Sequence, residues 1–355
     1  MSRFFSQKYA SHVPYVPGEQ PKDIPFIKLN TNESPFPPSP AAIQLAEQEA
    51  QKLHLYSDPE CSDLKKAACT QFDIEPEEII FTNGSDDVLN FAFQAFCDSE
   101  HPAVFADITY GFYSVFAKYN NVPYEIIPLR EDFSICAEDY ISIHKTIFIA
   151  NPNAPTGLAL SLSDIERILQ SNPDNVVVID EAYVDFGSKS AVSLIHRYNN
   201  LLVTQTFSKS RSMAGARLGF GIGCKELIKD LNTIKFSTNP YNVNRMTMAA
   251  GIGAFEDKEY FEQNCQAIIE NRTWTTNQLR NLGFHVLDSM TNFVFAESPA
   301  IDGKTLYLKL REKGILVRHF DTDRLRNFNR ITIGSMEQMQ AFIDAVKNIL
   351  GVKEA

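Results

Sequence analysis

Short runs of apolar residues alternate with helical patterns through the middle of the chain. The runs cover residues 79–81, 103–105, 147–150, 176–179 and 201–203. Unbroken β-rich runs of this length are typical of strands buried on both faces of a sheet. One intervening helix is expected to begin at Ser163, because Glu166 stands at capping-box spacing from it. The pattern predicts an α/β fold whose mostly parallel central sheet is flanked by helices.

The pattern differs near both ends of the chain. Residues 1–40 contain eight prolines and show no sustained periodicity, so they are expected to form an extended arm. A break at residues 237–242 precedes a long helical pattern over residues 246–282, which Gly283 ends. We therefore expect a large domain over residues 41–245.

Residues 246–355 are predicted to form a smaller α+β C-terminal domain. After the long helical pattern come strand-like runs at residues 292–295, 315–318 and 330–333. The last helix is expected to begin at Ser335, because Gln338 again has capping-box spacing.

Composition and charge limit the class of protein. Hydrophobic residues make up 44% of the chain and charged residues 22%, which are globular proportions. No apolar run approaches the roughly 20 residues that span a bilayer, and no export signal is apparent, so a cytoplasmic protein without membrane contact is expected. The net charge of −11 disfavours a nucleic-acid partner. The six cysteines show no ligand spacing, so no metal site is expected.

Lys209 is the first candidate for chemistry, because it follows the predicted strand at residues 201–203. A lysine that projects from a core strand into a partly dehydrated pocket loses hydration of its ammonium form, and its amine can then attack a carbonyl. The nearby Thr206, Ser208 and Arg217 are suited to holding a phosphate. These groups match the requirements of covalently bound pyridoxal phosphate. A surface lysine in a polar loop is the competing interpretation.

Asp180 ends the predicted strand at residues 176–179, at the sheet edge where open α/β folds bind ligands. Its carboxylate could pair with a pyridinium nitrogen and keep that ring protonated. Tyr183 could reach the phenolic oxygen of the same ring. The alternative is a helix N-cap aspartate followed by a packing tyrosine.

Two further segments face the same predicted edge. Gly84, Ser85 and Asp86 open a helix whose free backbone amides could bind an anion. Tyr110 is positioned to stack on a flat ring, although a core aromatic is the commoner fate of a tyrosine. The alternative for the helix start is that Asp86 and Asp87 are ordinary residues of a helix N-terminus.

The loop at residues 151–157 follows another predicted strand and offers the amide side chains of Asn151 and Asn153. An amide donor there would stabilise the phenolate form of the ring oxygen and lower the pKa of a lysine imine. A proline-fixed loop without this role is the alternative.

Arg318 and Arg330 flank the two late strands of the C-terminal domain. Two neighbouring arginines form a fork for a carboxylate or a phosphate. The competing interpretation is that each is a strand-end charge that faces water.

In chain order, these segments resemble the fold-type I pyridoxal-phosphate aminotransferases, and most closely the histidinol-phosphate aminotransferases. The matching motifs lie at residues 29–35, 56–59, 151–157, 180–183, 208–217, 317–318 and 330–334. The chain departs from the family pattern at Ala154, where the family often has asparagine before Pro-Thr-Gly. Either Asn151 or Asn153 must then supply the amide, and the choice between them is open.

The resemblance implies a role for each candidate residue. Lys209 would form the Schiff base, Asp180 would hold the pyridine nitrogen, Tyr183 would bind the phenolate oxygen, and Tyr110 would stack on the ring. The residues implied to bind the cofactor phosphate are Gly84, Ser85, Asp86, Thr206, Ser208 and Arg217. The substrate anion would be bound by Arg330 with the help of Arg318, Tyr15 and Asn32. Tyr56 would reach the cofactor of a neighbouring subunit, which implies a homodimer.

The reaction implied by the resemblance is transamination of histidinol phosphate with 2-oxoglutarate, which yields imidazole acetol phosphate and glutamate in histidine biosynthesis. Two enzymes of the same fold are alternatives: an aromatic amino acid aminotransferase and a threonine-phosphate decarboxylase. A binding protein that keeps the fold without catalysis is a third.

Overall fold

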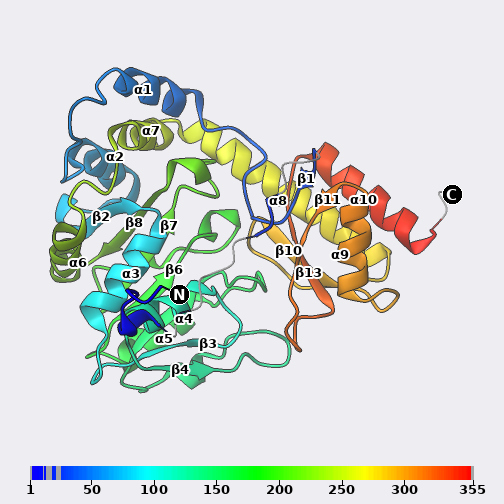
Figure 1. Ribbon diagram of the computed structural model, residues 1–355, viewed down its shortest axis with the longest axis horizontal. Helices are drawn as coiled ribbons and strands as arrows, with labels where there is room; N and C mark the ends of the chain where they lie inside the picture. The colour runs from blue at the N-terminus through cyan, green and yellow to red at the C-terminus, as the bar shows by residue number, and fades with distance from the viewer. Residues whose placement is uncertain (1, 11, 13–17, 21–24, 353–355) are drawn as a thin grey trace.

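A seven-stranded sheet forms the centre of the larger lobe in the computed structural model, which describes residues 2–10, 12, 18–20 and 25–352 (Figure 1). In spatial order its strands are β2 (Ile79–Asn83), β8 (Leu218–Gly223), β7 (Leu201–Thr206), β6 (Val177–Asp180), β5 (Thr146–Ala150), β3 (Ala103–Ala106) and β4 (Tyr124–Ile127). Strand β8 is antiparallel to both neighbours, and the other pairs are parallel. The predicted mostly parallel sheet is confirmed.

The sequence pattern missed strands β4 and β8 for different reasons. Strand β4 lies at the sheet edge, where Glu125 and Ile126 are exposed, so it lacks a continuous apolar run. Strand β8 is interrupted by glycines that hide its apolar character. One of them, Gly219, lies so close to helix α3 (Ser85–Phe96) that a Cβ there would overlap the backbone nitrogen of Ser85. This close approach places the N-terminus of α3 at the sheet edge.

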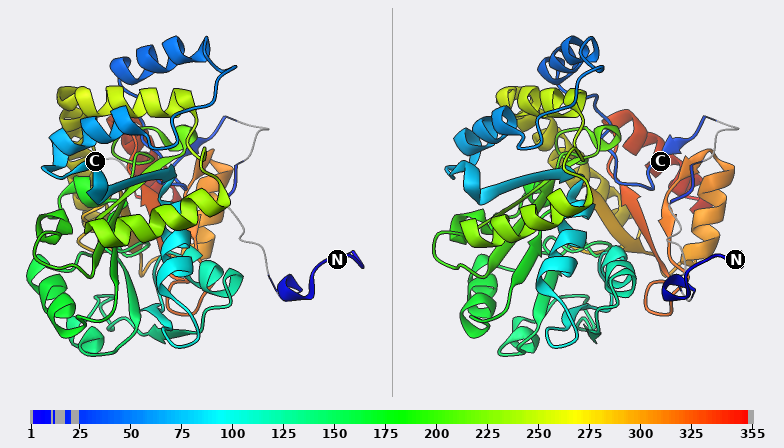
Figure 2. Two further views of the ribbon diagram at one scale, coloured as in Figure 1. Left: turned by 90° about the vertical axis from the view of Figure 1, so that its left-hand side faces the viewer. Right: turned by 60° about the vertical axis from the view of Figure 1, so that its left-hand side comes forward.

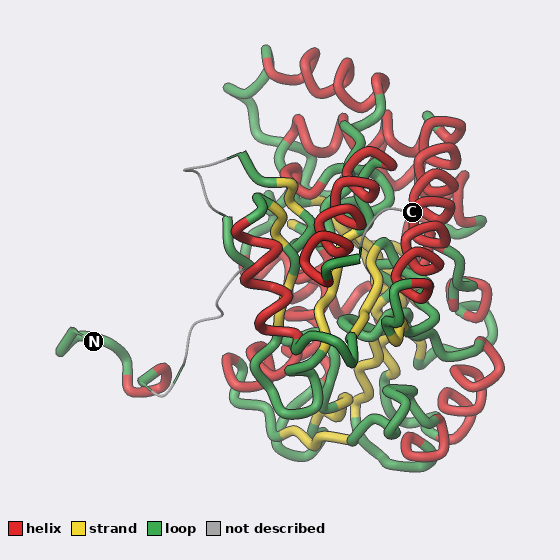
Figure 3. The backbone as a smooth tube through the Cα atoms, turned by 90° about the vertical axis from the view of Figure 1, so that its right-hand side faces the viewer, coloured by secondary structure: helices red, strands yellow, loops and turns green. Residues whose placement is uncertain are grey.

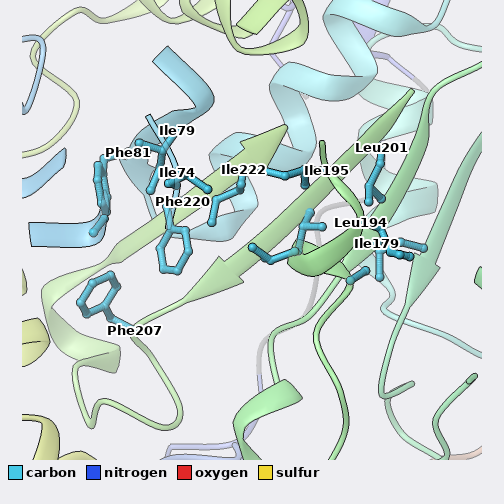
Figure 4. Close-up of a cluster of buried hydrophobic side chains, with 14 of the residues drawn as sticks. Ile74, Ile79, Phe81, Ile179, Leu194, Ile195, Leu201, Phe207, Phe220 and Ile222 are labelled. Carbon is cyan, nitrogen blue, oxygen red and sulfur yellow. The ribbon is translucent and has the colours of Figure 1, made fainter. Parts of the chain in front are cut away.

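Helices cover both faces of the large sheet. On one face pack α2 (Ser62–Phe72), α5 (Leu162–Ser171) and α7 (Arg245–Glu256). On the other face pack α3, α4 (Phe112–Tyr119) and α6 (Lys225–Thr238). Figure 4 shows part of the first cluster, in which the Phe220 ring lies near both Phe81 and Phe207. Each large apolar side chain buried in this way stabilises the fold by about 1.5–3 kcal/mol.

The second lobe is built on a four-stranded antiparallel sheet with the order β12 (Arg318–His319), β13 (Phe328–Thr332), β10 (Phe293–Glu297) and β9 (His285–Val286). Its helices are α8 (Lys258–Asn281), α9 (Gly303–Glu312) and α10 (Met336–Leu350), which Figure 3 shows beside its strands. Helix α10 has the expected capping box between Ser335 and Gln338.

The single long helix expected over residues 246–282 is wrong, because the structure divides it at Asp257 into α7 and α8. Asp257 leaves the helical conformation, and this turn lets α7 pack against α1 (Pro40–Ala50) while α8 continues into the second lobe (Figure 1). Since α7 packs on the large sheet, we propose a domain boundary at Asp257 rather than at residue 245.

The N-terminal arm contacts both lobes. Strand β1 (Ile27–Lys28) pairs in parallel with β11 (Ile315–Leu316) of the second lobe. A short 3₁₀ turn at Gln7–Tyr9, dark blue in Figure 2, lies near the N-terminus of the chain. Its Tyr9 ring stacks on Tyr119 at the end of α4, with ring centres 5.4 Å apart. Among the residues that the structure describes, no helix is both long enough and apolar enough to cross a membrane.

Candidate active site

Two adjoining cavities lie at the carboxyl ends of β5, β6 and β7. The larger has a volume of about 660 Å³ and the smaller about 280 Å³. Both are lined by Thr31, Tyr110, Ala154, Tyr183 and Lys209, so they form one continuous site. This is the sheet edge at which the sequence placed its candidate residues.

Lys209 lies where the two cavities meet. Its ammonium donates to the backbone oxygen of Thr31 at 3.3 Å and lies 5.9 Å from the centre of the Tyr183 ring. Loss of hydration on burial, together with the positive charge of Arg330, lowers the pKa of Lys209 to about 8. The free amine that a nucleophile or a base requires is therefore far more populated near neutral pH than in an ordinary lysine.

Asp180 lies at the end of β6, in the wall of the smaller cavity, and is 5% exposed. Burial raises the pKa of Asp180 to about 6, although the hydrogen bond that Tyr113 donates to Oδ2 at 2.9 Å opposes the shift. The other oxygen, Oδ1, is buried and has no partner within the described part of the chain. A protonated ring nitrogen of pyridoxal phosphate would satisfy this oxygen, so the site fits the cofactor.

The N-terminus of α3 forms a second wall of the smaller cavity, lined by Ser85 and Asp86. Gly84 has a positive φ of 78°, and a Cβ there would stand 2.5 Å from Nη2 of Arg217. Arg217 also contacts Asp86, with Nη2 to Oδ2 at 2.9 Å. Backbone amides and a guanidinium thus converge on one point, which is a suitable site for a phosphate.

Hydroxyl groups complete this phosphate-binding region. Thr206 Oγ1 donates to Ser208 Oγ at 2.9 Å and accepts from the Ser208 backbone amide at 3.1 Å. Both residues line the smaller cavity. Tyr110 donates its hydroxyl proton to Asp86 at 2.7 Å, which fixes its ring in the cavity wall. Six of the seven candidates for the phosphate and the ring face therefore line one cavity with Lys209, and the seventh, Gly84, lies against Arg217.

Arg318 and Arg330 lie directly opposite each other on β12 and β13 and line the larger cavity. Arg330 donates to the backbone oxygen of Asn30 at 3.0 Å, and its guanidinium lies 5.3 Å from the centre of the Phe293 ring. These contacts hold a pair of guanidinium groups on the side of Lys209 away from the phosphate-binding region, where they can bind a second anion.

The structure corrects the expected role of Asn151 and Asn153, because neither lines either of the two cavities that Lys209 joins. Asn151 donates to the backbone oxygen of Leu160 and accepts from its amide. Asn153 donates to the Ile108 oxygen at 2.9 Å and accepts from the Thr109 hydroxyl. Both amides are used to fix the loop, and Ala154 lines the cavities instead.

The remaining three candidates have different positions. Asn32 lines the larger cavity, but its side chain is bonded to protein groups. Tyr56 is 81% exposed, stacks on Tyr241 with ring centres 4.7 Å apart, and lines neither cavity of its own chain. Tyr15 lies outside the described residues.

Sequence reasoning missed Tyr113 and Thr332. Tyr113 is fully buried behind Asp180 and follows Tyr110 by three residues, in the turn that leads into α4, where its amide donates to the Tyr110 carbonyl at 3.2 Å. Thr332 bonds to Asn32 and follows Arg330 by two residues on β13, so both point to the same face of the strand. In both cases the spacing from a residue that was already a candidate could have pointed to the missed residue.

Comparison with known proteins agrees with this geometry. Residues 24–346 match the family described as aminotransferase class I and II. The chain is 49% identical to histidinol-phosphate aminotransferase of Brachyspira hyodysenteriae over 352 residues and 47% identical to that of Clostridium botulinum over 351 residues, with 99% of each chain covered. Its fold is similar to that of histidinol-phosphate aminotransferase from Sinorhizobium meliloti in complex with pyridoxal-5'-phosphate, with a TM-score of 0.84 and 23% identity over 91% of this chain and 90% of that one.

Proposed function

Because this chain belongs to the class I and II aminotransferases, we propose that it transfers the amino group of L-histidinol phosphate to 2-oxoglutarate, a step of histidine biosynthesis. The family resemblance found in the sequence motifs is confirmed by these matches. The observation that carries the proposal is the position of the Arg318 and Arg330 pair, on a cavity that Lys209 reaches. The cytoplasmic location expected from the sequence remains a prediction.

The cofactor of this family is pyridoxal phosphate, which supplies an aldehyde that condenses with amines and a ring that stabilises negative charge on the substrate Cα. Asp180 would keep the proton on the ring nitrogen, and Tyr183 would donate to the phenolic oxygen. The phosphate would be held by the α3 N-terminus together with Thr206, Ser208 and Arg217. Tyr110 would cover one face of the ring.

Lys209 would act twice. It would attach the cofactor through Nζ, and after the substrate amine displaces it, the free amine would take the proton from the substrate Cα. Its lowered pKa suits this role, because a base must be unprotonated when it acts. Thr31 lies within reach of Nζ and would help to hold the free amine.

Arg330, with Arg318, would bind the anionic group of each substrate in turn. The planar guanidinium fork can donate hydrogen bonds to the phosphate of histidinol phosphate or to a carboxylate of glutamate and 2-oxoglutarate. One cavity can therefore serve both halves of a ping-pong cycle. The alternative enzymes of the same fold would use the same residues to bind the cofactor. The turnover of their substrates must therefore be compared directly with that of histidinol phosphate.

The proposed function is tested by absorbance spectroscopy of the purified protein loaded with pyridoxal phosphate. Addition of L-histidinol phosphate is expected to convert the spectrum of the bound cofactor to that of the amine form, and 2-oxoglutarate should restore it. Phenylalanine and threonine phosphate, at the same concentrations, serve as controls and should react more slowly. A spectrum that responds to phenylalanine but not to histidinol phosphate would favour an aromatic aminotransferase.

We also propose a homodimer in which Tyr56 reaches the site of the second copy. Exposed apolar side chains gather on α1, on the segment that follows it and beside Tyr56, and they include Ile43, Leu53, Leu55 and Tyr241. Such a patch is typical of a surface covered by another chain. Sedimentation of the cofactor-loaded protein is expected to give twice the 40.0 kDa chain mass. A fully active species of 40.0 kDa would contradict the dimer.

A further inference from the structure

Asn32 lies where the arm and both lobes meet, and its backbone is fixed on two sides. It is 1% exposed and has a positive φ of 54°, a conformation that asparagine adopts more readily than most residues. Its amide donates to Thr332 Oγ1 at 2.9 Å, and its carbonyl accepts from Asn292 Nδ2 at 3.0 Å. The side chain therefore starts from a rigid point.

The two ends of the Asn32 side chain have different partners. Oδ1 accepts the proton of the Thr332 hydroxyl at 3.0 Å, which directs Nδ2 to the other side. Nδ2 donates to the hydroxyl oxygen of Tyr183 at 2.9 Å. Because Tyr183 accepts this bond, its own proton is not needed to satisfy Asn32 and can be donated into the cavity.

The cavity has few other groups that could serve as this donor. Ala154 has no polar side chain, and the amides of Asn151 and Asn153 are bonded within their loop. The hydroxyl of Tyr110 is committed to Asp86. Of the two tyrosines that line this cavity, Tyr183 is thus the one whose hydroxyl proton is left for a ligand.

We propose that Asn32 is a positioning residue: by donating to Tyr183, it makes that hydroxyl a donor to the phenolic oxygen of the cofactor. This inference rests on the proposed function, because it requires bound pyridoxal phosphate. It also changes the role expected for Asn32, whose amide serves Tyr183 rather than the substrate.

The inference predicts a change in the titration of the bound cofactor. A donor to the phenolic oxygen favours its anionic form and lowers the pH midpoint at which the absorbance of the resting enzyme changes. In the variant Asn32→Asp, the carboxylate accepts the Tyr183 proton and turns it away from the cavity. The midpoint is expected to rise by about one pH unit, as the loss of one hydrogen bond to a charged group implies.

The experiment is a pH titration of the absorbance of holoenzyme variants without substrate. The charged groups around Tyr183 are Arg330, Asp180, Asp86 and Lys209, and all four are kept. Tyr183→Phe should raise the midpoint by a similar amount, and Asn32→Asp should add little in that background. Asn30→Asp controls for the new charge, because it adds a carboxylate two residues away. The Asn30 side chain donates to the backbone oxygen of Glu19 and not to Tyr183. The shift in this control should be clearly smaller.

The outcomes separate the inference from the proposed function. If Tyr183→Phe shifts the midpoint and Asn32→Asp shifts it no more than Asn30→Asp, the positioning role is overturned and the function stands. If Tyr183→Phe causes no shift, the proposed contact of Tyr183 with the cofactor fails as well. Should Asn32→Asp not fold, Asn32→Gly keeps the left-handed backbone without the amide. An unchanged midpoint in that variant would equally overturn the inference.

Discussion

Replacement of Lys209 by alanine is expected to abolish transamination, with kcat/KM reduced by about 10³-fold or more. The variant loses both the covalent attachment of the cofactor and the amine that takes the substrate proton. Its measurement is the rate of glutamate formation from histidinol phosphate and 2-oxoglutarate, together with the absorbance of the bound cofactor. The band of the lysine-bound form should be absent even when cofactor is present in excess.

Loss of activity in this variant should not come from unfolding. Folding lowers the pKa of Lys209 from 10.5 to about 8, so the unfolded chain holds this proton more tightly. The buried ammonium therefore destabilises the fold fully at pH values below about 8, and this effect is lost as the pH rises from about 8 to 10.5. Lys209→Ala is therefore expected to unfold at a temperature no lower than the parent at pH 7. Lys225→Ala is the matched control, because Lys225 is an exposed lysine paired with Glu75 and should leave turnover within about twofold. Full activity of Lys209→Ala would refute the mechanism.

The placement of Lys209 and Asp180 could be predicted from the sequence because both follow apolar runs. Such a run identifies a buried strand, and the carboxyl ends of neighbouring parallel strands lie along one edge. The structure bears out this step, since β6 and β7 are adjacent and both residues line the smaller cavity. The local pattern is sufficient to place these two residues, because every parallel strand of a sheet ends at the same edge.

The detailed contacts could not be predicted in this way. The bonds of Asn151 and Asn153 depend on how residues 108–109 and 160 pass beside their loop, which no local pattern records. Asn32 and Thr332 are 300 residues apart in the chain and meet only because the arm lies against β13. The sequence shows which side chains can form hydrogen bonds. Their partners could not be predicted, because they are determined by tertiary packing.

The division of the long helical segment at Asp257 also could not be predicted from a local pattern. The helical periodicity continues across residues 246–282, so the pattern gives no sign of two elements. The two segments pack on different lobes, and the chain turns at Asp257 to reach both. Periodicity describes which face of a helix is apolar but does not tell whether one core or two will cover it.

Replacement of Asp180 by asparagine is the second change with a large expected effect. The amide cannot carry the negative charge that would keep the ring nitrogen protonated, and removal of one partner from a buried ion pair costs roughly 3–5 kcal/mol. If that cost falls on the transition state, kcat decreases by about 10²–10⁴-fold. Single-turnover measurement of the histidinol phosphate half-reaction would show it. Tyr113→Phe is the control: it removes the donor to Oδ2, keeps the charge, and should decrease the rate far less. A rate for Asp180→Asn within about tenfold of the parent would mean that the buried Oδ1 of Asp180, which has no partner among the described residues, serves no ring nitrogen.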